Sequence, residues 1–506
     1  MVELGRTLMI QGTASSVGKS LLVAGLCRYF KQLGLRVAPF KSQNMALNSF
    51  ATPEGLEIGR AQAMQAQAAG VAPHVDMNPI LLKPEAEARA QVVVMGKPQG
   101  SFSAQAYHDR KREFGATIAD ALARLRARHD IVVIEGAGSP AEINLRDRDV
   151  ANMFVAELAD APVMLVGDID RGGVFASLLG TLMLLTPAER ARVKALIVNK
   201  FRGDRRLLDS GIVMLEERAQ CPVLGVVPYL RDLGIADEDS VALEDRRPAA
   251  PADERLDVAV VLFPYISNYD DVLPLENEPG VAVRFVGAVE EVGEPDLLIL
   301  PGTKRTVGDM AWLRRQGLAD VVAERVRQGQ PVFGICGGYQ MLGQAIADPL
   351  GIEGPAGEVE ALGHLSCRTR FAADKVTRQV QALSCPSFVS DGEALSTTSA
   401  GYYIHMGRVE LAADAQPLLR VDGVGEGCVA PHAPVAGTLQ HGIFDHDRLR
   451  GQLIRYLRRR RGVLTPYQVR AHRPDDAFDR LAATLRDTLD PTLLHAIVGL
   501  EAHDGG

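Results

Sequence analysis

The sequence predicts an α/β protein with two parallel-sheet domains, and three observations lead to this prediction. The chain has 506 residues, which is more than one hydrophobic core usually organises. Its first half alternates helical periodicity with short, almost wholly apolar runs, as in a parallel sheet covered on both faces. A stretch rich in charge, alanine and proline then precedes a second pattern of the same kind.

The expected elements can be taken in chain order. Strands of the first domain are predicted at residues 7–10, 131–134, 163–166 and 195–198, with helices at 20–33 and 114–128. Strands of the second domain are predicted at residues 258–262, 297–300 and 331–333. The resulting boundaries are a first domain at 1–230, a linker at 231–254, a second domain at 255–456 and a helical C-terminal tail at 457–506. Four arginines at 458–461 indicate a solvated helix face rather than a ligand site.

Composition excludes several classes of function. Hydrophobic residues make up 47% of the chain, and the net charge of −8 argues against a general nucleic-acid binder. Six scattered cysteines without a CxxC pair predict neither a disulfide framework nor a zinc site. The N-terminus lacks the pattern of a signal peptide, and no apolar stretch is long enough to span a bilayer. We therefore expect a cytoplasmic protein without a membrane partner.

The stretch GTASSVGKS, residues 12–20, follows the first predicted strand and opens a helix, which is the context of a phosphate-binding loop. Backbone N–H groups would cradle phosphates, Lys19 would neutralise them, and Ser20 would bind Mg²⁺. In the usual pattern G-x-x-x-x-G-K-[ST], the position of the first glycine is occupied here by Thr13. Gly12 lies one residue earlier, so the loop is one residue longer than usual. A plain turn rich in glycine and serine is the alternative. The predicted ATP-binding residues of the loop are Gly12, Thr13, Gly18, Lys19 and Ser20.

Acidic residues end two further predicted strands. Glu135 follows the apolar run 131–134, and at the carboxyl end of a central strand it could hold Mg²⁺ together with Ser20. Asp168 and Asp170 follow the next strand, where they would join the metal shell, orient substrate, or only cap the following helix. For Glu135 the alternative is a glutamate at a surface turn.

The second domain contains a cysteine between glycines, in the stretch GICGG at residues 334–338. This pattern is typical of a nucleophile elbow, in which a strand turns sharply into a helix and exposes the side chain. A cysteine nucleophile needs a base, and His441 is the first candidate, with His405 as its rival. Backbone N–H groups at Gly302 and Gly337 could form an oxyanion hole. The other cysteines are expected to be core residues.

At this point the residues resemble known families. The elbow and the later stretch GTLQHG, residues 437–442, are similar to class I glutamine amidotransferases, whose second-domain fold would be flavodoxin-like. In that family a Glu usually follows two residues after the base. This chain has Ile443 there, and the cobalamin-pathway branch of the family is similar in lacking that Glu. A further departure is Tyr403, where a Glu is usual. The phosphate loop resembles that of dethiobiotin synthetase, which would make the first domain a doubly wound P-loop domain.

Four further stretches tighten the resemblance to the cobyric acid synthase family: KSQNMALN at 41–48, EGAGS at 135–139, GDIDRGGVF at 167–175 and NKFRGD at 199–204. The resemblance implies ATP- and glutamine-dependent amidation of carboxylates b, d, e and g of adenosylcobyrinic acid a,c-diamide, a corrinoid polycarboxylate. It implies ATP and Mg²⁺ as cofactors and glutamine as ammonia donor. The candidates for contacts with substrate or phosphate are Lys41, Asn44, Asp168, Arg171, Asn199 and Lys200, and a local basic surface could also include Arg146 and Arg202.

Two alternatives remain open at the level of sequence. The first is another acid amidotransferase, such as the a,c-diamide synthase. The second belongs to another class: a nucleotide-switched binding protein with an inactive amidotransferase module, which the missing third triad residue would fit. For Lys41 the alternative to a phosphate contact is an ordinary surface lysine.

Overall fold

The computed structural model describes residues 4–86, 89–103, 105–107, 111–230, 233–235, 255–384, 397–463, 465–471 and 473–500. These residues form two compact units, and neither unit is a single stretch of chain. The first consists of Met1–Ala46, Glu57–Ile235 and Arg473–Gly506, and the second of Leu47–Leu56 and Ala236–His472. Of the predicted linker 231–254, all but 233 to 235 lies outside the described residues.

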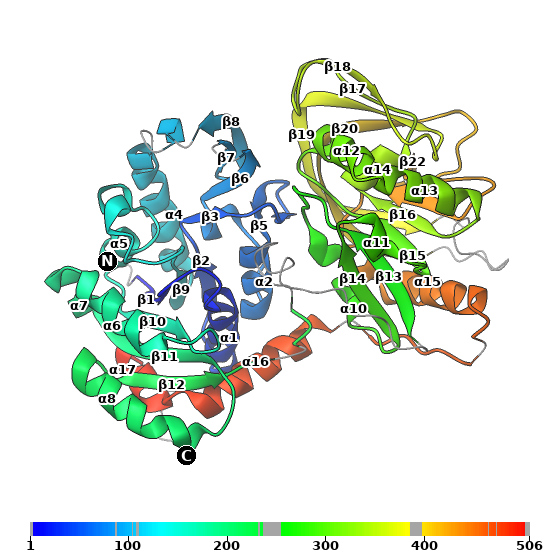
Figure 1. The fold of residues 1–506 in the computed structure, drawn as a ribbon. Coiled ribbons are helices and arrows are strands. Elements are labelled where there is room, and N and C mark those ends of the chain that lie inside the picture. The colour runs from blue at the N-terminus through cyan, green and yellow to red at the C-terminus, as the bar shows by residue number, and fades with distance from the viewer. Residues whose placement is uncertain are drawn as a thin grey trace. The chain divides into compact units, whose positions relative to one another are not determined.

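The first unit is built on a parallel sheet with the strand order β12-β11-β10-β1-β9-β2 (Figure 1). Apolar side chains point to both faces, since Leu8 and Ile10 join one hydrophobic cluster and Met9 joins the other. The prediction of a doubly wound sheet is therefore confirmed. Its strands are β1 (Arg6–Gly12), β2 (Val37–Phe40), β9 (Ile131–Glu135), β10 (Val163–Asp168), β11 (Val193–Phe201) and β12 (Val223–Pro228).

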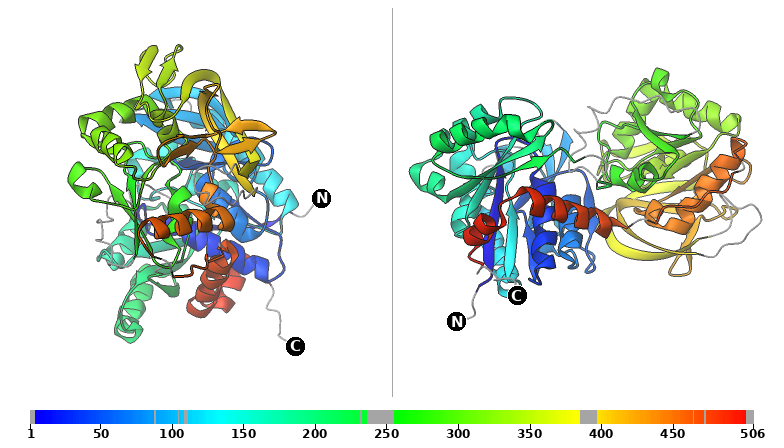
Figure 2. Two further views of the ribbon diagram at one scale, coloured as in Figure 1. Left: turned by 90° about the vertical axis from the view of Figure 1, so that its right-hand side faces the viewer. Right: turned by 90° about the horizontal axis from the view of Figure 1, so that it is seen from below.

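Helices cover both faces of this sheet. Buried residues of α1 (Lys19–Gln32), α16 (Pro474–Thr488) and α17 (Pro491–Val498) pack on one face, with part of α2 (Arg60–Ala69). Helix α16, red in Figures 1 and 2, lies against α1. The residues predicted as a C-terminal tail thus complete the first unit from residue 473 on. The helices on the other face are α4 (Gly115–Arg128), α5 (Met153–Leu158), α6 (Val174–Leu184) and α8 (Asp209–Ala219).

A smaller sheet with the order β3-β6-β7-β8 also belongs to the first unit. Its strands are β3 (Gln43–Met45), β6 (Ile80–Ala86), β7 (Arg89–Val94) and β8 (Lys97–Ser103). The short elements of this unit are β5 (Glu57–Gly59), α7 (Pro187–Arg192) and the 3₁₀ turns η1 (Val75–Met77), η2 (Lys111–Phe114), η3 (Ile143–Arg148) and η4 (Arg205–Leu208).

The second unit repeats the α/β arrangement with the strand order β14-β13-β15-β16-β24-β23, in which only the pairing of β23 with β24 is antiparallel. The strands are β13 (Leu256–Val261), β14 (Val281–Val286), β15 (Leu297–Leu300), β16 (Val332–Ile335), β23 (Cys428–Val429) and β24 (Val435–Thr438). The helices and turns are η5 (Tyr269–Val272), α10 (Leu273–Glu276), α11 (Val289–Val292), α12 (Thr306–Arg315), α13 (Leu318–Arg327), α14 (Gly337–Leu342), η6 (Ile443–Asp445) and α15 (Asp447–Arg460).

A largely antiparallel sheet completes the second unit, with the order β18-β17-β19-β21-β22 and β20 paired to β19. Its strands are β17 (Ala345–Asp348), β18 (Gly357–Glu360), β19 (Cys367–Ser384), β20 (Thr398–Leu411), β21 (Leu419–Val421) and β22 (Val424–Glu426). The segment Leu47–Leu56, which also belongs to this unit, contributes β4 (Ser49–Ala51). The expected start of the C-terminal tail at residue 457 falls inside α15, whose buried face includes Leu453, Ile454 and Leu457. No helix among the described residues is long and apolar enough to cross a membrane.

Candidate active sites

The phosphate-binding loop lies between β1 and α1, as the sequence predicts. Gly18 has φ 99°, a conformation that favours glycine, and it precedes the first residue of the helix. The Lys19 ammonium donates to the carbonyl oxygens of Ala14 at 2.9 Å and Gly138 at 3.1 Å. A Cβ at Gly12 would lie 2.5 Å from Val17 Cγ2 and 3.0 Å from Lys19 Nζ, so the folded loop leaves no room for a side chain there. Thr13 is anchored by its N–H, which donates to Val166 O.

Glu135 lies at the carboxyl end of β9 and is 1% exposed. Its Oε1 accepts hydrogen bonds from Ser20 Oγ and from Lys41 Nζ, both at 2.8 Å. Its Oε2 accepts a bond from Gln65 Nε2 at 2.5 Å. The structure therefore brings the predicted residues Ser20, Lys41 and Glu135 together.

Gln65 was not among the predicted residues, and no spacing in the sequence singles it out, because it lies on α2 in a run of Ala and Gln. The donor set fits the predicted Mg²⁺, since a serine hydroxyl and a carboxylate are the oxygen ligands that this ion prefers beside bound phosphates.

Other predicted residues of the first unit support the loop. Asn199 Nδ2 donates to Val17 O at 2.8 Å, and Lys200 Nζ donates to Ser16 O at 2.6 Å and to Asp168 Oδ2 at 2.9 Å. Asn44 is buried on β3, where its side chain donates to Gln62 Oε1. Arg171 is exposed in the turn that follows β10.

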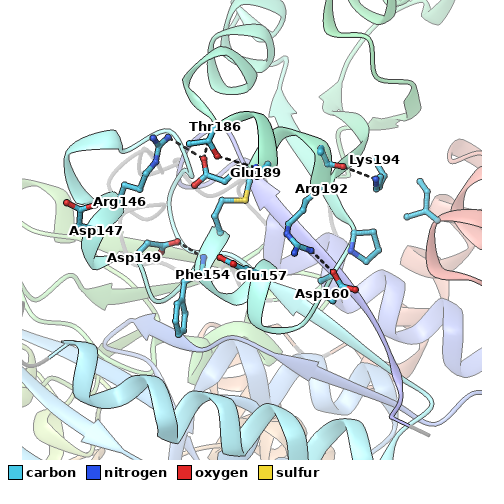
Figure 3. A pocket seen from close by; sticks show the side chains of 16 residues that line it. Arg146, Asp147, Asp149, Phe154, Glu157, Asp160, Thr186, Glu189, Arg192 and Lys194 are labelled. Atoms are coloured by element: carbon cyan, nitrogen blue, oxygen red, sulfur yellow. Dashed lines mark hydrogen bonds and ion pairs between the residues drawn. The ribbon is translucent and has the colours of Figure 1, made fainter.

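The cations expected to form a basic surface are largely paired with carboxylates. Lys41 pairs with Glu135, Lys200 with Asp168 and Arg202 with Asp170. Arg146 lies 3.5 Å from Glu189 and lines a cavity of about 820 Å³ (Figure 3). That cavity contains more carboxylates than cations and none of the loop residues described above, so it is separate from the nucleotide site. Its charged lining residues are Arg146, Asp147, Asp149, Glu157, Asp160, Glu189, Arg192 and Lys194.

Cys336 of the second unit joins β16 to α14 with φ 49° and ψ −108°, which is strained backbone for a residue with a side chain. The neighbouring glycines permit this turn. A Cβ at Gly338 would lie 2.0 Å from Leu300 O, and one at Gly334 would lie 2.6 Å from Tyr339 Cα. The Cys336 N–H donates to Thr438 O at 2.8 Å, which ties the turn to β24. This geometry is that of the predicted nucleophile elbow.

His441 is 2% exposed, and Cys336 is among the groups that raise the pKa of its imidazole. Its Nδ1 lies 2.7 Å from Asp271 Oδ2, while Asp271 Oδ1 accepts a bond from the Gly442 N–H at 2.8 Å. Burial opposes the charged imidazolium, but the charges and hydrogen bonds of Asp271 and Cys336 outweigh it, so the pKa of His441 is raised to about 10. Cys336, His441 and Asp271 therefore form a nucleophile–base–acid arrangement.

Asp271 takes the place of the acid that the sequence comparison with class I amidotransferases left missing. Ile443, at the usual position of that acid, is instead a buried core residue of η6. Asp271 lies 170 residues before His441 in the chain, so no local spacing links the two. The local signal for it is an acidic pair, Asp270 and Asp271, directly after Tyr269.

The rival base, His405, plays a different part. Its Nδ1 bonds to Gly407 O at 2.8 Å, and burial lowers the pKa of His405 to about 4, so this side chain stays neutral. Tyr403 is also buried, and its hydroxyl has no hydrogen-bond partner among the described residues. Neither residue takes the position of the missing acid beside His441.

Of the two predicted oxyanion glycines, Gly302 follows β15 and Gly337 lies in the elbow, directly after Cys336. A Cβ on Gly302 would lie 3.3 Å from His441 Cε1, and one on Gly337 would lie 3.2 Å from Thr303 N, the amide next to Gly302. Gly337 is also the first residue of α14, where a helix leaves its N–H groups without internal partners. The role of the Gly302 and Gly337 N–H groups in an oxyanion hole stays a prediction.

Comparison with known proteins assigns a family to each part of the chain. Residues 8–242 match a CobQ/CobB/MinD/ParA nucleotide-binding domain, and residues 257–449 match a CobB/CobQ-like glutamine amidotransferase domain. The cobyric acid synthase of Sorangium cellulosum is 56% identical over 98% of this chain and 99% of its own length. The cobyric acid synthase of Desulforudis audaxviator is 50% identical over 98% of this chain and 99% of its own length. That of Alkaliphilus metalliredigens is 47% identical over 98% of this chain and 100% of its own length.

Proposed function

This chain belongs to the cobyric acid synthase family, and from that premise we propose that it amidates carboxylates b, d, e and g of adenosylcobyrinic acid a,c-diamide to give adenosylcobyric acid. It is a glutamine-dependent amidating enzyme of cobalamin biosynthesis. The observation that carries the substrate is the identity of 56% over nearly the whole length of a relative with that name. ATP as a substrate and five buried, unpaired cysteines among the described residues support the cytoplasm as its compartment.

The first unit would activate the carboxylate. A carboxylate oxygen of the corrinoid attacks the γ-phosphorus of ATP, ADP leaves, and an acyl phosphate forms. Lys19 and the loop N–H groups would hold the phosphates, and Lys41 would contact the transferred phosphoryl group. Mg²⁺ held by Ser20 and Glu135 would neutralise phosphate charge. Ammonia then attacks the acyl carbon, and phosphate leaves as the amide forms.

The second unit would supply the ammonia. The Cys336 sulfur attacks the amide carbon of glutamine, His441 transfers a proton to the leaving nitrogen, and ammonia departs from a thioester. Water, deprotonated by His441, then hydrolyses the thioester to glutamate. Asp271 would stabilise the imidazolium and fix its orientation, because both of its oxygens are committed to His441 and Gly442. The N–H groups near Gly302 and Gly337 would stabilise the oxyanion.

The two sequence-level alternatives are less well supported. The three relatives described above, which align over 98% of the chain, carry the name cobyric acid synthase, and this disfavours the a,c-diamide synthase as the activity. An inactive module in a binding protein would not need a strained cysteine, a hydrogen-bonded histidine and a buried aspartate in one place.

Mass spectrometry of the corrinoid product tests this function. Cobyrinic acid a,c-diamide is incubated with protein, MgATP and either glutamine or ammonium chloride. We expect four successive amidations with glutamine, lost in Cys336→Ala and restored by ammonium. Cys428→Ala, which removes another buried cysteine of the same unit, is the matched control and should keep glutamine-dependent activity. An unmodified corrinoid in every sample, from protein that still binds ATP, would refute the substrate.

A further inference from the structure

Ten residues from the N-terminal half of the chain, Leu47–Leu56, belong to the unit that contains Cys336 and His441. Their strand β4 packs against β20, and Ala51 forms a small hydrophobic cluster with Tyr402, Ile404 and the partly buried Phe50. Ser49, Ala51 and Thr52 are 0% exposed. These three residues are therefore buried, whereas Pro53 and Glu54 of the same segment are exposed.

The segment holds Asn268 through three hydrogen bonds. Asn48 Oδ1 accepts a bond from the Asn268 N–H at 2.7 Å. The Ser49 N–H donates to Asn268 Oδ1 at 3.1 Å, and Asn268 Nδ2 donates to Ser49 O at 2.8 Å. Asn268 has φ 51° and precedes the turn η5, which carries Asp271. These bonds thus support a left-handed residue that lies three positions before Asp271, at the start of the same turn.

Asn268 also reaches the base of the triad through an aromatic ring. Its Nδ2 donates to Tyr402 Oη at 2.9 Å. The Tyr402 ring stacks on the imidazole of His441, with ring centroids 5.3 Å apart and an interplanar angle of 22°. The backbones of Tyr402 and His441 exchange two hydrogen bonds, at 3.2 Å and 3.0 Å. Phe50 of the segment packs on the same tyrosine ring at 4.5 Å.

We propose that Asn268 and Tyr402 are positioning residues for His441, and that the segment Leu47–Leu56 holds them in place. Asp271 fixes the edge of the imidazole by a hydrogen bond, whereas Tyr402 fixes its plane by stacking. A base works when its lone pair points at the proton that it removes, and a displacement of about 1 Å can cost on the order of 100-fold in rate. The inference rests on the proposed roles of Cys336 and His441 in glutamine hydrolysis.

The test compares Tyr402→Phe with Tyr403→Phe. The first variant removes only the hydroxyl that Asn268 binds. The second removes the buried hydroxyl of the adjacent residue, which has no hydrogen-bond partner in the part of the chain that the structure describes. For Tyr402→Phe we expect kcat of glutamine hydrolysis to fall by about 10-fold, with KM for glutamine within about twofold, because orientation and not binding is lost. Tyr403→Phe should match the native protein, and ammonium-dependent amidation should be unchanged in both.

A second pair of variants probes the segment itself. Asn48→Ala removes the acceptor of the Asn268 N–H, whereas Asn48→Asp keeps an acceptor oxygen in that place. We expect the alanine variant to lower kcat in the same way as Tyr402→Phe, and the aspartate variant to recover part of the loss. This pair keeps the inference testable if one tyrosine variant does not fold.

The rate of alkylation of Cys336 by iodoacetamide, followed on its peptide by mass spectrometry across pH, separates orientation from general destabilisation. With His441 less firmly held, alkylation of Cys336 should be slower in Tyr402→Phe and Asn48→Ala than in the native protein. Native pH profiles and native kcat in both variants would overturn the inference, and so would equal losses in Tyr403→Phe. Glutamine-dependent amidation that survives Cys336→Ala would instead refute the proposed function, so the two failures can be told apart.

Discussion

Replacement of Asp271 by asparagine is the sharpest test of the arrangement around His441. Asp271 Oδ1 accepts from the Gly442 N–H, and Oδ2 lies 2.7 Å from His441 Nδ1. Asparagine has the same shape but only one acceptor oxygen. If that oxygen keeps the bond to Gly442, the NH₂ group faces His441 Nδ1 and favours the tautomer with the proton on Nε2. That tautomer cannot take a proton from Cys336.

The size of the effect can be bounded. A hydrogen bond to a charged group contributes about 1.5–3 kcal/mol and a neutral one about 0.5–1.5 kcal/mol, so loss of charge alone costs about 1.5 kcal/mol, or roughly 10-fold. In serine protease triads, where the same change also selects the wrong tautomer, kcat falls about 10⁴-fold. Because both effects apply to Asp271→Asn, we expect kcat of glutamine hydrolysis to fall by about 10³-fold, between these limits.

The assay measures glutamate release and, in parallel, ammonium-dependent amidation. Asp270→Asn is the matched control, because Asp270 is on the same turn but is not among the groups that raise the pKa of His441. We expect Asp271→Asn to lose glutamine-dependent activity and to keep the ammonium-dependent reaction, while Asp270→Asn stays within a few-fold of the native protein. A loss of less than about threefold in Asp271→Asn would refute the assignment of Asp271 as the third member of the triad.

Three further outcomes are expected. Glu135→Gln should lose ATP-dependent amidation with glutamine and with ammonium but keep basal glutamate release, because the Glu135 carboxylate binds Ser20 and Lys41 in the first unit and glutamine is hydrolysed in the second. Equal loss of both activities would contradict this division of the two reactions between the units. Gly338→Ala should abolish glutamine hydrolysis, because the added Cβ would lie 2.0 Å from Leu300 O, and a fully active variant would show that the elbow can relax. The pKa of His441 is raised, so its stabilising contribution is complete below pH 6.5 and is lost as pH rises through about 10. As the pH is raised between these limits, the free energy of unfolding measured with urea should therefore fall more in the native protein than in His441→Gln. Equal decreases in the two proteins would argue against a charged His441.

Local motifs explain what could be predicted from the sequence. The phosphate loop and the cysteine elbow are contiguous, and each needs glycine at fixed positions for steric reasons, as the close contacts at Gly12 and Gly338 show. The ends of parallel strands meet at one edge of a sheet, which allowed Glu135 to be paired with the loop.

The residues that sequence reasoning missed depend on contacts between distant parts of the chain. Asp271 meets His441 only because the turns η5 and η6 pack together. Gln65 reaches Glu135 because α2 packs beside α1, and glutamine on a helix has no spacing that marks this use. Likewise, the pattern of residues 473–500 predicts amphipathic helices but not the sheet that they cover, since many apolar faces could accept them.

The return of α16 and α17 to the first unit has a consequence for biosynthesis. Phe478, Leu481 and Leu485 fill the hydrophobic layer that also contains Leu22 and Leu26 of α1. A ribosome makes β1 and α1 before the second unit, and it makes their covering helices only after that unit. The nucleotide-binding unit therefore waits with one apolar face uncovered until the whole glutaminase unit has been synthesised. This order should raise the demand for chaperones during synthesis, and it should lower the success of any attempt to split the gene after residue 254.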